Sequence, residues 1–83
     1  MSSIKQIIWQ GDLNDDCLSN WNGLLLRAEC MADNDWWWCV YDMDNDEIQI
    51  DSSNNHSMNI NDGALARKLA EDCARNYRND RRR

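Results

Sequence analysis

Three consecutive tryptophans, Trp36, Trp37 and Trp38, constrain the fold of this chain more than any other feature. Successive side chains of a β-strand point to opposite faces of the sheet, so a strand through this run separates Trp37 from Trp36 and Trp38. One of the two faces can form the core. The other face must be covered by another segment, or it is a surface that binds a partner.

The flanking pattern predicts that residues 24–31 and 36–43 form an antiparallel hairpin. If Cys30 lies opposite Trp36, the alternating apolar side chains of the first strand share the face of Trp36 and Trp38. A shift by one residue would bring two charged side chains to that face instead. The hydrophobic pattern therefore selects this register.

Two segments precede the hairpin. Residues 4–10 are rich in β-branched and aromatic side chains, which predicts a first strand. In residues 13–20 and just beyond, Leu13, Cys17 and Trp21 recur at every fourth position, which is typical of a short helix. The Asn and Ser residues of this segment are equally compatible with a structured loop, so both alternatives stay open.

After the hairpin, residues 44–46 are expected to form a three-residue loop that leads into a strand over residues 47–52. This loop length places Ile48 and Ile50 on the face of Trp38. A two-residue loop would place them on the opposite face. We expect the longer loop, because it leaves one face of the sheet consistently apolar.

Residues 63–77 carry an apolar stripe with the period of an amphipathic helix, and Asn61 or Asp62 can cap its start. The stripe consists of Leu65, Ala66, Leu69, Ala70, Cys73 and Tyr77. The sequence therefore predicts an α+β fold, in which a three- to four-stranded antiparallel sheet carries a C-terminal helix on one face.

The chain has 83 residues, which is typical of a single small domain. We expect one domain over residues 1–80 and a basic tail over residues 81–83. No run of about 18 apolar residues suggests a membrane span, and the N-terminus lacks the apolar run of a signal peptide. These features predict a cytoplasmic protein.

The charge is distributed unevenly along the chain. Residues 1–62 contain twelve acidic and two basic residues, a net charge of −10, whereas residues 63–83 contain three acidic and seven basic residues, a net charge of +4. An acidic body of this kind favours a partner with a basic surface, because the opposite charges attract over a long range.

No pattern points to catalysis, a cofactor or a metal. The four cysteines form no Cys-x-x-Cys pair, and we expect four reduced thiols. Asp42, Asp44 and Asp46 copy the first ligand positions of a calcium loop, but its glycine and its final glutamate are missing. His56 has no neighbouring base or nucleophile. We therefore predict that the protein is not an enzyme.

The second face of the predicted sheet combines aromatic, methionine and charged side chains, a composition enriched at protein interfaces. It consists of Leu25, Arg27, Glu29, Trp37, Cys39, Tyr41, Met43, Gln49 and Asp51. Either the N-terminal strand or residues 12–22 cover this face, or it binds a partner. The candidate partner-binding residues are Trp37, Tyr41, Asp33, Asp35, Asp44, Asp46, Glu47, Arg27 and Glu29.

Three features together resemble a group of small acidic proteins from phages and mobile elements. They are residues 36–38, the carboxylates between Asp12 and Asp51, and residues 64–67 at the start of the helix. Anti-CRISPR proteins and related inhibitors of host defence belong to this group. The resemblance implies a protein that binds and blocks a nucleic-acid-handling complex in the host cytoplasm, although it transfers no role to an individual residue.

Two further functions fit the sequence. One is a nucleic-acid-binding module with Trp37 as a stacking aromatic side chain. Its basic residues would be Arg67, Lys68, Arg75, Arg78 and the tail. The other is a homodimeric adaptor or structural protein that associates through the second face of the sheet.

Overall fold

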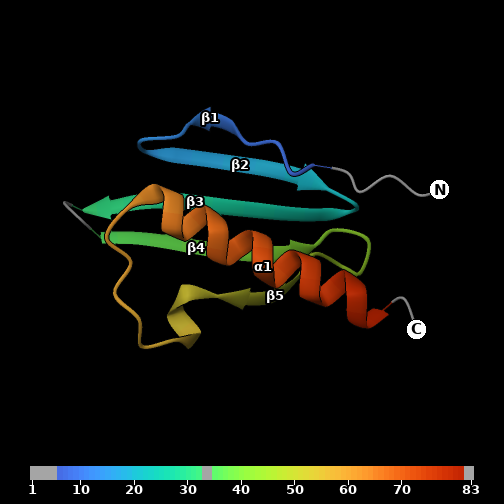
Figure 1. The fold of residues 1–83 in the computed structure, drawn as a ribbon. Coiled ribbons are helices and arrows are strands. Elements are labelled where there is room, and N and C mark those ends of the chain that lie inside the picture. Colours follow the sequence, from blue (N-terminus) through green and yellow to red (C-terminus); the bar gives the residue numbers. More distant parts are fainter. Residues whose placement is uncertain (1–5, 33–34, 82–83) are drawn as a thin grey trace.

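The computed structural model describes residues 6–32 and 35–81 and shows an α+β fold, as the sequence predicts. An antiparallel sheet contains the strands in chain order, and α1 crosses one of its faces (Figure 1). The described elements are β1 (Gln10–Asp12), β2 (Asp16–Trp21), β3 (Leu24–Ala32), β4 (Asp35–Asp42), β5 (Ile48–Ser52), the short 3₁₀ helix η1 (Ser53–Asn55) and α1 (Gly63–Arg81). The described sheet thus has five strands rather than three to four.

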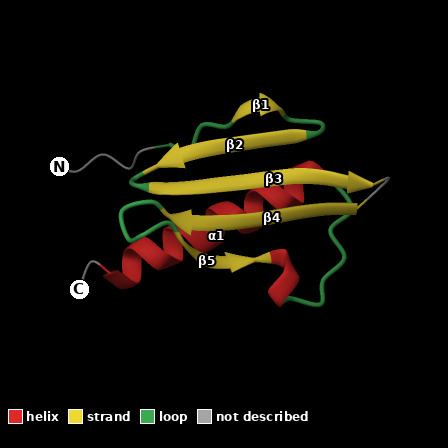
Figure 2. Ribbon diagram, turned by 180° about the vertical axis from the view of Figure 1, so that it is seen from behind, coloured by secondary structure: helices red, strands yellow, loops and turns green. Residues whose placement is uncertain are grey.

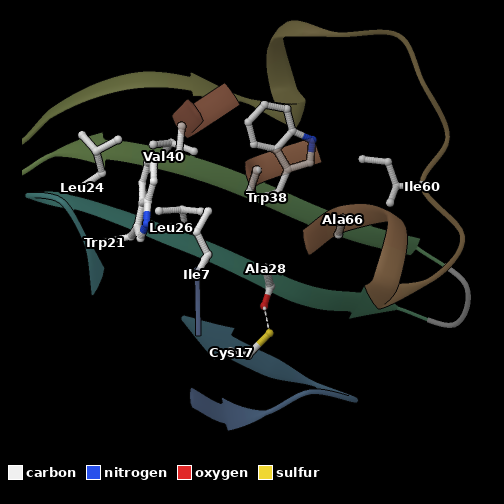
Figure 3. Packing of buried hydrophobic residues seen from close by; sticks show 12 residues of the cluster. Ile7, Cys17, Trp21, Leu24, Leu26, Ala28, Trp38, Val40, Ile60 and Ala66 are labelled. Atoms are coloured by element: carbon white, nitrogen blue, oxygen red, sulfur yellow. Dashed lines mark hydrogen bonds between the residues drawn. The ribbon is translucent and has the colours of Figure 1, made fainter. Parts of the chain in front are cut away.

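The register of the β3–β4 hairpin is the predicted one. Cys30 pairs with Trp36, and Ala28 pairs with Trp38. Ala28 and Val40 are fully buried beneath α1, and Trp38 is only 4% exposed. Figure 3 shows Val40 and Trp38 on the same side of the sheet as Leu24 and the helix. The apolar pattern identifies the core face because a slip of one residue would turn Arg27 and Glu29 toward the core instead.

The short helix expected around residues 13–20 is wrong, because β2 occupies residues 16–21 as a strand paired with β1 and β3. The fourfold spacing of Cys17 and Trp21 suits a strand as well as a helix, since four residues are also two strand repeats. Both side chains are buried, and Ser19 between them is buried too. The Ser19 hydroxyl donates a 2.7 Å hydrogen bond to the Ile8 carbonyl, which satisfies this polar group in the core.

The strand expected over residues 4–10 is also wrong in its described part, because residues 6–9 have no strand pairing and β1 begins at Gln10. Residues 4 and 5 lie outside the described residues. Ile7 is buried in the core, and the Trp9 indole donates a 2.8 Å hydrogen bond to Glu71 of α1. This segment therefore fills the gap between the sheet and the helix instead of extending the strand ladder.

The β4–β5 hairpin starts in the predicted register and then departs from it. Ile48 pairs with Asp42 as expected, although the strand begins at Ile48 rather than at residue 47. An irregularity then shifts the pairing, so that Asp51 lies opposite Val40 where Ile50 was expected. This extra residue turns Asp51 to the helix side of the sheet, which corrects its predicted place on the second face.

The two hairpin turns contain the residues with positive φ that such turns require. Asn22 and Gly23, with φ of 51° and 79°, close the two-residue loop between β2 and β3, as such residues do in type I′ turns. In the turn after β4, Asp46 and Glu47 have φ of 58° and 56°. An aspartate thus supplies a left-handed residue, as predicted, and Glu47 belongs to the turn.

Helix α1 starts at an aspartate cap. The Asp62 carboxylate accepts a 2.7 Å hydrogen bond from the Leu65 N–H, as predicted for one of the two candidate caps. The helix contacts the sheet through Ala66, Ala70 and Ala74, all fully buried. Their small side chains let the helix backbone lie close to the strands, and larger apolar residues flank this line. No helix in the described part of the chain is both long and apolar enough to span a membrane.

Candidate partner-binding surface

The sheet face opposite α1 is not covered by any described segment, as the view from behind shows (Figure 2). The strand pairings define this surface, here called the open face. It consists of Gln10, Asp12, Asp16, Leu18, Asn20, Leu25, Arg27, Glu29, Trp37, Cys39, Tyr41 and Gln49. Ile7, Trp9 and Trp21 pack in or against the core on the helix side, and residues 16–21 form β2 within the sheet. Neither segment proposed as a cover therefore lies over the open face.

Partly buried apolar side chains lie around Arg27, which occupies the middle of the open face. Trp37 and Tyr41 project from β4, Leu25 lies opposite Tyr41 on β3, and Leu18 lies one strand further on. All four side chains are of intermediate exposure. They therefore keep apolar surface that a partner can remove from water.

Cys39 forms the floor between the two aromatic residues. Although it belongs to the open face, its exposed fraction is 0%, because larger neighbours cover it. Burial raises the pKa of the Cys39 thiol, while its hydrogen bond with Tyr41 and the charge of Arg27 act in the opposite direction. The buried thiol therefore acts as a packing group in the sheet.

Acidic residues surround the single basic residue of the described strands, Arg27. Its guanidinium lies 3.3 Å from the carboxylate of Asp16 and 3.9 Å from the carboxylate of Glu29. Two acids thus face one base, and the open face carries a net negative charge. The partly exposed ion pairs contribute little to folding, so their main effect is on how the surface attracts other molecules.

The predicted site residues fall into two groups. Trp37, Tyr41, Arg27 and Glu29 lie together on the open face. The acids lie at the ends of β4: Asp35 starts the strand, and Asp44, Asp46 and Glu47 lie in the turn that follows it. Asp33 is outside the described residues. Asp35 at the start of β4 and the three acids in the turn after it therefore flank the open face along the direction of the strands.

Sequence reasoning missed the contribution of β2 to this surface. Asp16, Leu18 and Asn20 face outward, whereas the residues between them face the helix. The alternation of outward and inward positions was the available signal. The assumed helix or loop obscured it, because the buried position between Cys17 and Trp21 is a serine.

Two of the three aspartates that resemble calcium ligands, Asp42 and Asp44, interact with other side chains instead. Asp42 is only 2% exposed and accepts a hydrogen bond from Tyr77, while Asp44 lies 3.9 Å from the Arg78 guanidinium. Within residues 6–32 and 35–81, no group of three or more His, Cys, Asp or Glu side chains is arranged to hold a metal ion. His56 bonds to Asp51 at 2.9 Å and stacks on Trp38.

No model of a protein family, no curated protein and no solved structure matches this chain. Its function has to be inferred from the fold and from the chemistry of its surfaces.

Proposed function

We propose that this protein is a non-enzymatic inhibitor that binds a protein partner through the open face. The observation that carries this proposal is the pair of half-buried aromatic side chains, Trp37 and Tyr41, on a sheet face that no described segment covers. The partner we propose is the basic surface of a nucleic-acid-handling defence complex in the host cytoplasm, the class of target implied by the resemblance to phage inhibitors such as anti-CRISPR proteins.

The two groups of site residues support different stages of binding. The carboxylates near both ends of β4 attract a basic surface and align it with the strands, since long-range charge mainly raises the association rate. Trp37 and Tyr41 then lose their remaining exposed area against the partner. Desolvated aromatic residues near the centre of an interface usually carry most of its binding energy.

The structure offers less support for a nucleic-acid-binding module. Four of the basic residues proposed for that role have partners within the described part of the protein. Arg67 bonds to the Leu13 carbonyl at 2.9 Å, Lys68 to Asp72 at 2.9 Å, Arg75 to Glu71 at 3.3 Å, and Arg78 to the Asn22 carbonyl at 2.9 Å. In addition, Trp37 lies on the face opposite α1, so one strand of nucleic acid would not reach both.

Capture from a bacterial lysate, with competition by nucleic acid, tests the proposal. We expect the immobilised protein to retain a nucleic-acid-binding complex and to lose it when duplex DNA or RNA is added. Trp37→Ala should abolish retention. Ile8→Ala is the matched control, because Ile8 is 66% exposed and lies before β1, outside the paired strands that form the open face.

Four outcomes would contradict the proposal. Equal retention by the Trp37→Ala variant would remove the open face from the interaction. Retention that nucleic acid does not reduce would exclude competition with nucleic acid. Direct binding of the purified protein to DNA or RNA would favour the nucleic-acid-binding module, and a concentration-dependent dimer that Trp37→Ala dissociates would favour the homodimer.

A further inference from the structure

A groove of about 300 Å³ lies at the end of the sheet where β4 begins. It is lined by Met31 of β3, residues 35–37 of β4, residues 53 and 54 of η1, and Met58 of the segment before α1. This surface is here called the end groove. It exists because β5 pairs with β4 only from Cys39 onward, which leaves the first residues of β4 without a neighbouring strand on that side.

The walls of the end groove are held in place by backbone hydrogen bonds. The Trp36 N–H donates to the Ile60 carbonyl at 2.9 Å, and the Trp38 N–H donates to the Ser53 hydroxyl at 3.2 Å. Met31 and Met58 are 60% and 55% exposed, so their flexible thioethers remain free to adapt to a ligand. The groove thus combines a fixed frame with adaptable apolar sides.

The described residues that line the end groove carry one negative charge and no positive charge. Asp35 is the one charged residue among the described residues that line it, and none of them is a lysine or an arginine. Arg67 lies close to Gly63, which packs against Trp36, but its guanidinium bonds to the Leu13 carbonyl and does not line the groove. A carboxylate and two tryptophan residues therefore line one groove without a basic residue among the described lining.

We propose that the end groove binds the side chain of an arginine from the partner protein. A guanidinium is planar, so it can stack on an indole and bond to the Asp35 carboxylate at the same time. Its alkyl stem would contact the two thioethers. A neutral apolar side chain would instead cover Asp35 and leave the carboxylate without a partner. This inference rests on the proposed function, because Trp37 belongs to both the end groove and the open face.

Titration with the peptide acetyl-Gly-Arg-Gly-amide tests this inference on the isolated protein. The indole N–H signals in NMR spectra report on each tryptophan separately. We expect saturable shifts of the Trp36 and Trp37 signals and none for Trp21, which is buried on the helix side. The same peptide with citrulline, which has nearly the same shape but no charge, should bind about tenfold more weakly.

Asp35→Asn should weaken binding of the arginine peptide severalfold. Asp72→Asn is the matched control, because it removes the same charge from α1, outside the end groove, and should have no effect. If Asp35→Asn broadens the spectrum and so disturbs the fold, Met58→Thr is the second variant, since Met58 is exposed outside the strands. It should also weaken binding.

Equal binding of the citrulline peptide, absence of Trp36 and Trp37 shifts, or tighter binding of a lysine peptide would overturn the inference. So would unchanged binding by both Asp35→Asn and Met58→Thr. Failure here is separable from failure of the proposed function. If the peptide does not bind but capture from lysate still requires Trp37, only the arginine site is wrong. If the peptide binds but capture is independent of Trp37, only the proposed function is wrong.

Discussion

The phenol of Tyr77 donates a 2.7 Å hydrogen bond to the carboxylate of Asp42, which joins the C-terminal half of α1 to the end of β4. Asp42 is only 2% exposed, and it also accepts a hydrogen bond from the Asp44 N–H at 3.1 Å. A buried carboxylate is costly unless its oxygens are hydrogen-bonded. This contact therefore helps to determine where the helix lies across the sheet.

We expect Tyr77→Phe to lower the free energy of unfolding by about 1–3 kcal/mol, because it removes a donor from a buried charge. Tyr41→Phe is the control, since it removes the same hydroxyl from the partly exposed open face, and we expect about 1 kcal/mol or less. Urea unfolding of both variants measures the difference. Equal losses would show that the bond between Tyr77 and Asp42 has no special role.

The two faces of β4 should differ in their effect on stability. Trp38 is 4% exposed beneath α1, so Trp38→Ala should cost about 3–5 kcal/mol. Trp37 is partly exposed on the open face, and Trp37→Ala should cost about 1 kcal/mol or less. Urea unfolding compares them, and equal costs would mean that both faces belong to the core.

Asp51 should contribute stability that depends on pH. Partial burial acts to raise the pKa of Asp51, but hydrogen bonds from Asn55, His56 and the Ser52 N–H outweigh it and lower the pKa below its usual value. The stabilisation is therefore complete above the unfolded pKa of about 3.9 and is lost as the pH falls through the lower folded value.

Chemical unfolding of wild type and Asp51→Asn between pH 3 and pH 6 measures this effect. The stability difference between them should be largest near pH 6 and should shrink toward pH 3. Asn55→Ala is a useful comparison, because it keeps the carboxylate and removes one donor, so its pH-dependent difference should be smaller. A difference that stays constant over this range would show that the folded pKa of Asp51 is not lowered.

The four cysteines should be reduced, and Cys73 should react slowly in the folded protein. Burial, and to a lesser extent the charge of Asp51, raises the pKa of Cys73 to about 11. At pH 8 only about 0.1% of such a thiol is ionised, against roughly a quarter of an ordinary one. Intact mass after alkylation should show slow modification of Cys73 in the native state.

Alkylation under non-reducing, denaturing conditions is the control, and it should modify all four cysteines. Cys30 lies in the helix-side register and Cys39 lies on the open face, so a disulfide between them would need the wrong side of the sheet. Absence of free thiols after unfolding would contradict both this register and the expected cytoplasmic location.

Acidic and aromatic residues should affect different binding rates. Replacing Asp35, Asp44, Asp46 and Glu47 by Asn and Gln should lower the association rate and its salt dependence, with little change in dissociation. Trp37→Ala or Tyr41→Ala should instead accelerate dissociation, because it removes desolvated contacts. Kinetics on a captured partner at two salt concentrations would separate these effects. If the acid-depleted variant associates at the wild-type rate at low salt, these acidic residues do not guide binding and contribute only to solubility.

The central hairpin and the helix could be predicted from sequence because each has one arrangement that buries its apolar residues. Pairing Cys30 with Trp36 places Ala28 and Val40 in the core, and every neighbouring register would bury charge instead. Likewise, the spacing of the alanines and leucines in α1 matches only a helix. Local patterns of this strength also separated Trp37 and Tyr41 from the core, which identified the centre of the candidate site.

Other features were decided by tertiary contacts that no local pattern encodes. Ser19 is tolerated in the core because its hydroxyl donates a hydrogen bond to the Ile8 carbonyl, and β2 is a strand because it pairs with both β1 and β3. The irregular pairing that turns Asp51 toward the helix is likewise a property of two strands together. Met31 and Met58 are far apart in the sequence and line one groove only after folding.

The sequence by itself determined the central sheet register, the helix and the alternation of faces, because periodic burial is a local property. The tertiary structure alone decided the sheet edges and the end groove, because polar satisfaction and surface shape depend on distant residues.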